Sequence, residues 1–149
     1  MMNEIVEGIS GPRIGLHICR GNWSTREDVL LSGDYAPLLP ALTAMDIDQF
    51  VLEYATPRAG DIAVVGQALN SKELGLGVVN PRTITAESPE EIVERAEKAL
   101  TFYRPDQLWL NTDCGFGCFA HRCVNVESVA AAKITNIVRA ARILRERHG

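Results

Sequence analysis

The sequence predicts an α/β fold in which four strand–helix units build a parallel sheet. Short apolar segments alternate along the chain with longer segments of helical periodicity, and strands separated by helices run parallel through right-handed crossovers. The chain has 149 residues, of which 46% are hydrophobic and 23% are charged, as in an ordinary globular domain. We therefore expect one domain over residues 1–149.

Four short apolar runs have the length and composition of buried strands. They lie at residues 14–19, 49–54, 74–80 and 107–111. The third run contains Gly75 and Gly77. Glycine inside a strand indicates that a neighbouring backbone packs closely against it.

Helical segments follow these strands at residues 33–45, 61–69, 88–103 and 126–147. Pro37 and Pro40 confine the first of them. The third has the clearest signal, with Ser88 as N-cap, Pro89 at the first helical position and Glu91 completing a capping box. The last helix is expected to bury one apolar face, made of Val129, Ala130, Ile134, Ile137, Val138, Ala141 and Leu144.

Four strand–helix units are half of an eight-unit barrel. A free half-barrel leaves two strand edges open and its inner face, which we expect to be apolar, uncovered. The chain is therefore expected to pair with another chain or with itself, or to be the C-terminal part of a longer enzyme. A small doubly wound domain is the alternative architecture.

Charge and the first residues of the chain argue against several partners and locations. The net charge of −4 is unsuited to nucleic acid or an anionic membrane as the main partner. No apolar run approaches the roughly 18 residues that span a bilayer, and the first residues lack a secretory signal. We expect a cytoplasmic protein, in which the 4 cysteines are more often metal-binding or catalytic than cross-linked.

Four candidate metal ligands lie at the ends of three predicted strands. His17 and Cys19 are two residues apart on a strand, so their side chains point to the same face. Glu53 lies near the C-terminal end of the second strand, and Cys114 follows the last strand before a glycine-rich turn. In a barrel these strand ends meet at the rim that carries active sites. One nitrogen, two thiolates and one carboxylate are a suitable ligand set for zinc.

Other interpretations of these residues stay open from the sequence. Cys19 and His17 could be a buried cysteine and a hydrogen-bonded histidine. Glu53 could form a salt bridge with Arg58. A local zinc knuckle could instead use the closely spaced set Cys114, Cys118, His121 and Cys123.

The turn after the first strand supplies the candidate substrate-binding residues Arg20, Asn22 and Trp23. Glycine and asparagine suit a tight turn here. The guanidinium of Arg20 has the geometry to bind a substrate carboxylate or sulfonate. Alternatively, Arg20 is a loop arginine that is solvated or forms a salt bridge. Trp23 is a candidate pocket wall.

Three segments together resemble the cobalamin-independent methionine synthase family, and they read His17-Ile18-Cys19-Arg20-Gly21-Asn22, Leu52-Glu53-Tyr54 with Arg58-Ala59-Gly60, and Asp113-Cys114-Gly115-Phe116. The resemblance covers about residues 13–147. It implies the C-terminal half of a (β/α)8 TIM barrel that holds a catalytic zinc on His17, Cys19, Glu53 and Cys114. It further implies catalytic roles for Glu53 and Asp113.

By this resemblance the chain takes part in methyl transfer from a donor to the thiol of homocysteine, which forms methionine, and it needs an N-terminal half-barrel to be complete. Two features differ from the large folate-using enzymes. Arg20-Gly21-Asn22 stands where those enzymes have a tyrosine, as in the shorter branch that includes epoxyalkane:coenzyme M transferases. Thr112 replaces the proline of the family's Asn-Pro-Asp-Cys-Gly motif. The alternatives are therefore another acceptor thiol, such as coenzyme M, or a non-catalytic zinc-binding half-barrel.

Overall fold

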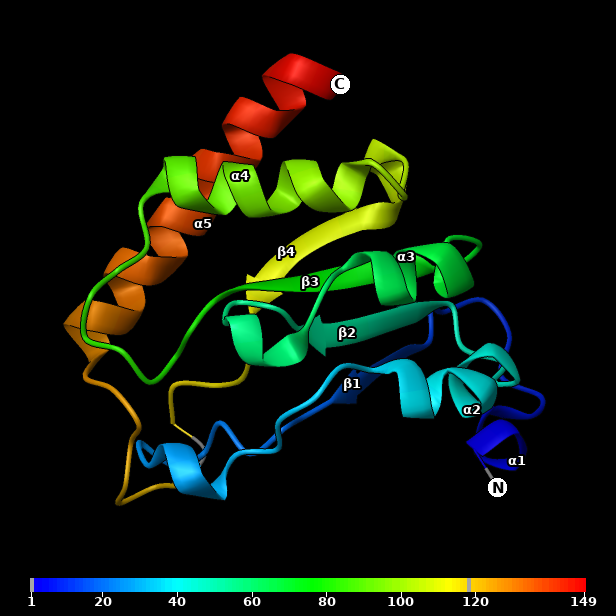
Figure 1. Ribbon diagram of the computed structural model, residues 1–149, viewed down its shortest axis with the longest axis horizontal. Coiled ribbons are helices and arrows are strands. Elements are labelled where there is room, and N and C mark those ends of the chain that lie inside the picture. Colours follow the sequence, from blue (N-terminus) through cyan, green and yellow to red (C-terminus); the bar gives the residue numbers. More distant parts are fainter. Residues whose placement is uncertain (1, 118) are drawn as a thin grey trace.

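The computed structural model describes residues 2–117 and 119–149, with the side chain of Glu27 left out. These residues form one sheet of parallel strands in the order β1 (Gly15–Ile18), β2 (Gln49–Glu53), β3 (Glu73–Val79) and β4 (Leu108–Thr112) (Figure 1). The helices are α1 (Met2–Val6), α2 (Leu39–Thr43), α3 (Ala63–Leu69), α4 (Pro89–Leu100) and α5 (Glu127–His148). The prediction of parallel strands alternating with helices is confirmed.

The element boundaries follow local sequence signals closely. In α4, the Ser88 hydroxyl accepts a hydrogen bond from the Glu91 backbone at 3.2 Å, and the Glu91 carboxylate accepts one from the Ser88 backbone at 2.7 Å. The predicted capping box is therefore present. The helical segment expected at 33–45 is shorter than predicted, since it holds only α2 and the 3-10 turn Ala36–Leu38. Helix α1 was not predicted.

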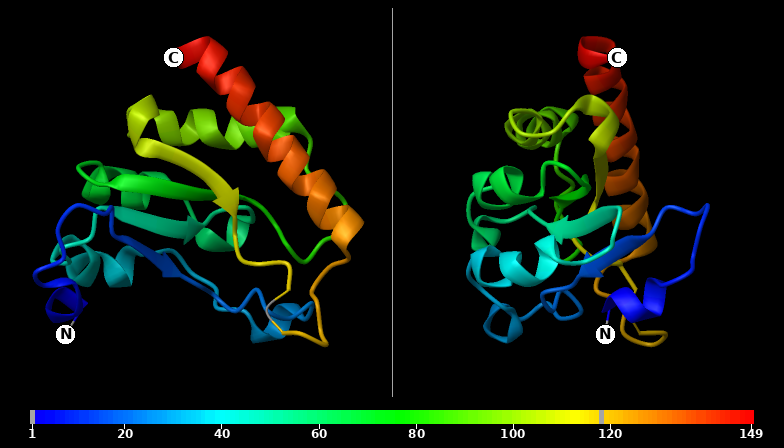
Figure 2. Two further views of the ribbon diagram at one scale, coloured as in Figure 1. Left: turned by 180° about the vertical axis from the view of Figure 1, so that it is seen from behind. Right: turned by 90° about the vertical axis from the view of Figure 1, so that its right-hand side faces the viewer.

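The two faces of the sheet differ sharply in burial. One face packs against helices, with α2, α3 and α4 on the same side (Figure 2), and its buried side chains are Phe50, Leu52, Leu74, Leu76 and Val78. The opposite face is the inner face of the expected half-barrel. Its residues at the N-terminal ends of the strands are half-buried or exposed.

The inner face is polar at this end, which corrects the expectation of an apolar surface. Glu73 accepts hydrogen bonds from Gln49 at 3.1 Å and from Trp109 at 2.7 Å. Its other oxygen pairs with Arg13 at 2.9 Å, and Arg13 also lies over the Trp109 ring. Because these groups stay in reach of water, polar side chains are tolerated without the cost of burial.

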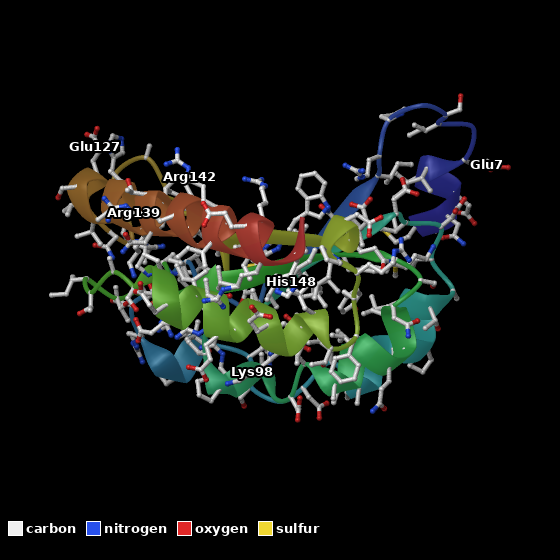
Figure 3. All side chains as sticks on the ribbon, turned by 90° about the horizontal axis from the view of Figure 1, so that it is seen from above. Glu7, Lys98, Glu127, Arg139, Arg142 and His148 are labelled. Atoms are coloured by element: carbon white, nitrogen blue, oxygen red, sulfur yellow. The ribbon has the colours of Figure 1, made fainter. Side chains whose placement is uncertain are left out.

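The long helix α5 packs beside α4 (Figure 3), but it does not bury the whole apolar face that was predicted. Ile137 and Leu144 are buried as expected, whereas Ile134 and Val138 are 46% and 45% exposed. Lys133 and Ala140, which were not part of the predicted face, are fully buried. Arg139 and Arg142 lie on the exposed surface of the same helix (Figure 3).

A groove of about 700 Å³ separates the C-terminal half of α5 from β4 and from the end of α4. Its apolar lining includes Leu100, Leu108, Leu110, Val138 and Ala141. The groove adjoins β4, which is the last strand of the described sheet and pairs only with β3 there. The predicted apolar face of α5 thus faces a space that the described part of the chain does not fill. None of the described helices combines the length and apolar character needed to cross a membrane.

Candidate metal centre

Four side chains that are far apart in the sequence meet at the C-terminal ends of the strands. His17 lies on β1, Cys19 follows that strand, Glu53 ends β2, and Cys114 follows β4. One possible ligand atom from each of them lies within 4.8 Å of the others. Parallel strands bring their carboxyl ends to one edge of a sheet, which explains why this set assembles.

The spacing of the two sulfur atoms suits a shared metal ion. The Sγ atoms of Cys19 and Cys114 are 3.7 Å apart. Two thiolates on a tetrahedral zinc, each about 2.3 Å from the ion, lie roughly 3.8 Å apart. A disulfide would need about 2.05 Å. The residues present therefore fit zinc, with one nitrogen, two sulfurs and one carboxylate as donors.

Glu53 is the buried member of the set, at 1% exposure. Its Oε1 accepts a hydrogen bond from the backbone N–H of Arg20 at 3.0 Å, and its Oε2 accepts one from Nδ2 of Asn22 at 2.5 Å. Arg58 lies 3.8 Å from Oε2, so the salt bridge that the sequence suggested is also present. The Tyr35 hydroxyl accepts a hydrogen bond from the Glu53 backbone at 2.9 Å. These contacts hold Glu53 in the interior, while His17 and Cys19 are exposed.

Asp113 lies beside the cluster and is buried to 1% exposure. Its Oδ1 accepts a hydrogen bond from the backbone of Ala55 at 2.9 Å. Burial raises the pKa of this carboxyl to about 7, against the lowering effect of the Ala55 hydrogen bond, and the negative charge of Glu53 adds to the rise. A Cβ on Gly77 would lie 2.2 Å from Oδ1, which confirms that the predicted close packing requires glycine there.

The three residues expected to bind substrate have different surroundings in the structure. Asn22 is fully buried against Glu53. Arg20 is also buried, and its guanidinium donates a hydrogen bond to the carbonyl of Gly33 and lies over the Tyr35 ring. It is the backbone of Arg20, not its side chain, that contacts the cluster. Contact of Arg20 and Asn22 with a substrate stays a prediction.

Trp23 is partly exposed and packs edge-on against Phe119, with ring centroids 6.3 Å apart. Arg122 lies over both rings. These contacts join the loop after β1 to the loop after β4. A role for Trp23 as a pocket wall stays a prediction.

The alternative zinc knuckle includes Cys118, which lies outside the described residues. Of its other members, His121 and Cys123 are exposed and are not among the residues that gather around Glu53. Cys114 lies instead with the residues from the other strand ends.

Sequence reasoning missed two residues of the site, Tyr35 and Arg82. The Nε of Arg82 donates a hydrogen bond to Oδ1 of Asn22 at 2.8 Å. The signal for Arg82 was available, because Asn80-Pro81-Arg82 follows the third strand at the same end as the other site residues. Tyr35 comes from a segment without a comparable strand-end position.

Comparisons with known proteins agree with this geometry. Residues 13–143 match the model of a family described as "Cobalamin-independent synthase, Catalytic domain". The methionine synthase of Pyrococcus abyssi is 32% identical over 145 residues, and that of Thermococcus kodakarensis is 30% identical over 144 residues. Each alignment covers 97% of this chain but 37% of the relative.

A solved structure shows the same fold. The B12-independent methionine synthase of Shewanella sp. W3-18-1 superposes with a TM-score of 0.82 at 23% identity, over 98% of this chain and 42% of that one. The predicted α/β architecture is thereby confirmed, and the chain spans less than half the length of the proteins it matches. The match to the family's catalytic domain over most of the chain shows that it belongs to the cobalamin-independent methionine synthase family.

Proposed function

We propose that this chain forms the zinc-binding part of an enzyme that transfers a methyl group to the thiol of homocysteine and forms methionine. The observation that supports it most directly is the meeting of His17, Cys19, Glu53 and Cys114 within 4.8 Å at the strand ends. Membership of the family supports the reaction class, and the ligand types support zinc.

The charge of the ligand set favours thiol chemistry over water activation. Two thiolates and a carboxylate contribute about −3 against the +2 of zinc, so the centre is electron-rich and poorly suited to make hydroxide. Zinc, when bound, keeps an added thiol ionised at neutral pH and so makes it a better nucleophile. The exposed side of the cluster, at His17 and Cys19, is where the thiol would approach.

Glu53 is the ligand that we propose makes room for the thiol. The backbone of Arg20 and the amide of Asn22 already donate hydrogen bonds to its two oxygens. A carboxylate that moved away from the metal would therefore keep partners for its charge, so the movement would not leave a buried charge unpaired.

We propose a catalytic role for Asp113, because its buried carboxyl directly precedes Cys114 in the chain and is close enough to Glu53 for their charges to interact. In this scheme the S–H bond of the thiol breaks and the proton passes to solvent on the exposed side of the cluster. The sulfur then forms a bond to the methyl carbon as the bond between that carbon and the donor breaks.

A further half-barrel is proposed as the structural partner, supplied either by an N-terminal segment or by a second copy of the chain. The relatives extend well beyond the region matched here. The groove beside β4 and the edge of β1 offer apolar and backbone surface to such a partner. Light scattering on the isolated chain should show self-association, whereas a monomer with one cooperative melting transition would contradict this proposal.

The test of the metal centre compares cysteine variants of the chain. Cys19→Ser and Cys114→Ser should release zinc, whereas Cys123→Ser should retain it. X-ray absorption of the wild-type chain should show two sulfur neighbours near ~2.3 Å from the zinc. Zinc lost from Cys123→Ser but retained by Cys19→Ser would favour the local knuckle.

The acceptor is tested with the complete enzyme. Homocysteine should release close to one proton on binding at neutral pH and add one sulfur neighbour to the zinc. Transfer of a labelled methyl group to coenzyme M instead of homocysteine would favour coenzyme M as the acceptor. If neither thiol bound to the zinc or received the methyl group, a non-catalytic zinc protein would be favoured.

A further inference from the structure

A buried arginine outside the predicted site reaches the metal centre through one side chain. Nε of Arg82 donates to Oδ1 of Asn22 at 2.8 Å, and Nδ2 of Asn22 donates to Oε2 of Glu53 at 2.5 Å. We propose that Arg82 is a positioning residue that orients the Asn22 amide and thereby holds the Glu53 carboxylate in place. This inference rests on the proposed function, because Glu53 matters here as a ligand of the proposed zinc site.

The chemistry of the amide explains why an arginine is needed at this position. An asparagine side chain has one oxygen that accepts hydrogen bonds and one NH2 group that donates them, while a guanidinium only donates. Arg82 therefore requires the oxygen of Asn22 to face it, which leaves the NH2 group facing Glu53. The flipped amide would place two donors together at Arg82 and two oxygens together at Glu53. Asn22 is fully buried, so water would not relieve either mismatch.

Arg82 is itself held by a buried network that begins on α5. Its backbone N–H donates to Oδ1 of Asn80 at 3.0 Å, and the Asn80 backbone donates to Oε1 of Glu87 at 2.8 Å. The ammonium of Lys133, which is fully buried, donates to Oε2 of Glu87 at 2.8 Å. The buried lysine of α5 thus anchors the loop that carries Arg82.

The expected consequence is a change in metal affinity. Asn22 and the Arg20 backbone each donate to one oxygen of Glu53. If the Asn22 amide is free to turn, Oε2 loses this hydrogen bond and keeps only the longer contact with Arg58 at 3.8 Å. Partners that orient a metal ligand typically account for 10- to 100-fold in affinity. We expect a loss in that range when Arg82 no longer holds Asn22.

The experiment is a cobalt titration of the full 149-residue chain in a double-mutant cycle. Arg82→Gln and Asn22→Ala should each lower cobalt affinity by about 10- to 100-fold, and the double variant should be no weaker than Asn22→Ala alone. Arg95→Gln is the matched control, because the Arg95 guanidinium donates a hydrogen bond at 2.8 Å to the carbonyl of Val78 on β3 and not to Asn22. Additive losses in the double variant, or equal losses in the control, would overturn the proposal.

Two further measurements keep the result interpretable. Arg82→Lys retains a charged donor and should recover part of the affinity, and it replaces Arg82→Gln in the cycle if that variant does not fold. In the metal-free chain, the side-chain NH2 protons of Asn22, identified by their loss in Asn22→Ala, should exchange slowly with water and lose this protection in Arg82→Gln. Protection that survives the substitution would refute the role of Arg82. If the wild-type chain bound no cobalt through sulfur, the proposed function would fail, while the exchange measurement would still decide the role of Arg82.

Discussion

Glu53 and Glu73 are carboxylates on adjacent strands of one sheet, yet their surroundings differ. The side chain of Glu53 is 1% exposed, and its oxygens accept hydrogen bonds from a backbone N–H and a buried amide. The side chain of Glu73 is 21% exposed and contacts Arg13, which is itself 52% exposed. Both carboxylates have several partners, so the number of partners does not separate them. The difference is burial, which makes every partner of Glu53 costly to lose and those of Glu73 replaceable by water.

The position along the strands explains this difference. At the C-terminal ends, the loops after β1, β3 and β4 bring Asn22, Arg82 and Cys114 around Glu53. At the N-terminal ends, Glu73 meets mainly side chains from neighbouring strands, such as Gln49 and Trp109. In this sheet, loop residues that surround Glu53 orient its carboxylate and bury it. Glu73 contacts mainly strand residues and stays partly exposed.

The largest expected effect comes from neutralising each carboxylate in turn. Glu53→Gln keeps the shape of the side chain but removes a ligand charge, so zinc affinity should fall by at least ~100-fold, beyond the usual effect of an orienting partner. Glu73→Gln should change it by less than about twofold, since Glu73 lies at the other end of the sheet and is partly solvated. Competition with a chromophoric chelator measures the zinc affinity of both variants. Equal losses of affinity would contradict the distinction between the C-terminal and N-terminal ends of the strands.

Glycine substitutions test the packing at the two ends. A Cβ at Gly77 would lie 2.2 Å from Oδ1 of Asp113, whereas one at Gly15 would meet only Gln49, at 3.6 Å. Gly77→Ala should therefore lower the free energy of unfolding by about 1–3 kcal/mol. Gly15→Ala should change it by less than about 0.5 kcal/mol. Denaturant unfolding of the metal-free chain at one protein concentration is the measurement, and a larger loss for Gly15→Ala would contradict this packing.

A third test uses the pH dependence of stability without metal. The pKa of Asp113 is raised from 3.8 to about 7 in the folded chain, so the folded state binds the proton more tightly than the unfolded state. This contribution to stability is complete below the ordinary pKa and is lost as pH rises towards 7, by at most ~1.4 kcal/mol per pH unit. Asp113→Asn, which stays neutral, should flatten the decline in unfolding free energy between pH 4 and 7. An unchanged slope would exclude Asp113 as its cause.

The smallest effect is expected at the exposed cluster. Arg13→Ala removes an ion pair and a contact with Trp109, both in reach of solvent. We expect a loss of less than about 1 kcal/mol, and a smaller one in high salt, because exposed pairs are screened. Unfolding at low and high salt measures it. A loss larger than that of Gly77→Ala would mean that this end of the sheet is as tightly organised as the metal end.

Local signals predicted much of the fold. The capping box of Ser88 and Glu91 marked the start of α4, and short apolar runs located the strands of the described sheet. The four candidate ligands were also predictable, because residues that end neighbouring parallel strands meet at one edge. These features depend on residues close in sequence or on a simple rule of topology.

Other features depended on contacts that no local pattern encodes. Arg20 was a candidate for contact with a substrate, and no local pattern indicated that the fold would bury its guanidinium against Gly33 and Tyr35. The expected apolar surface of α5 is only partly covered, and Lys133 is buried, because Glu87 and the loop after β3 lie against it.

The sequence by itself determined the order of the strands, the start of α4 and the set of candidate metal ligands, since each follows from periodicity, capping or strand-end position. The tertiary structure alone decided which partners surround them. Asn22 became a link between Arg82 and Glu53 because the loops after β1 and β3 converge on the end of β2, where all three side chains are buried. The physical reason is that a buried polar atom must find its partner within about 3 Å, and that distance is set by packing between segments up to 60 residues apart.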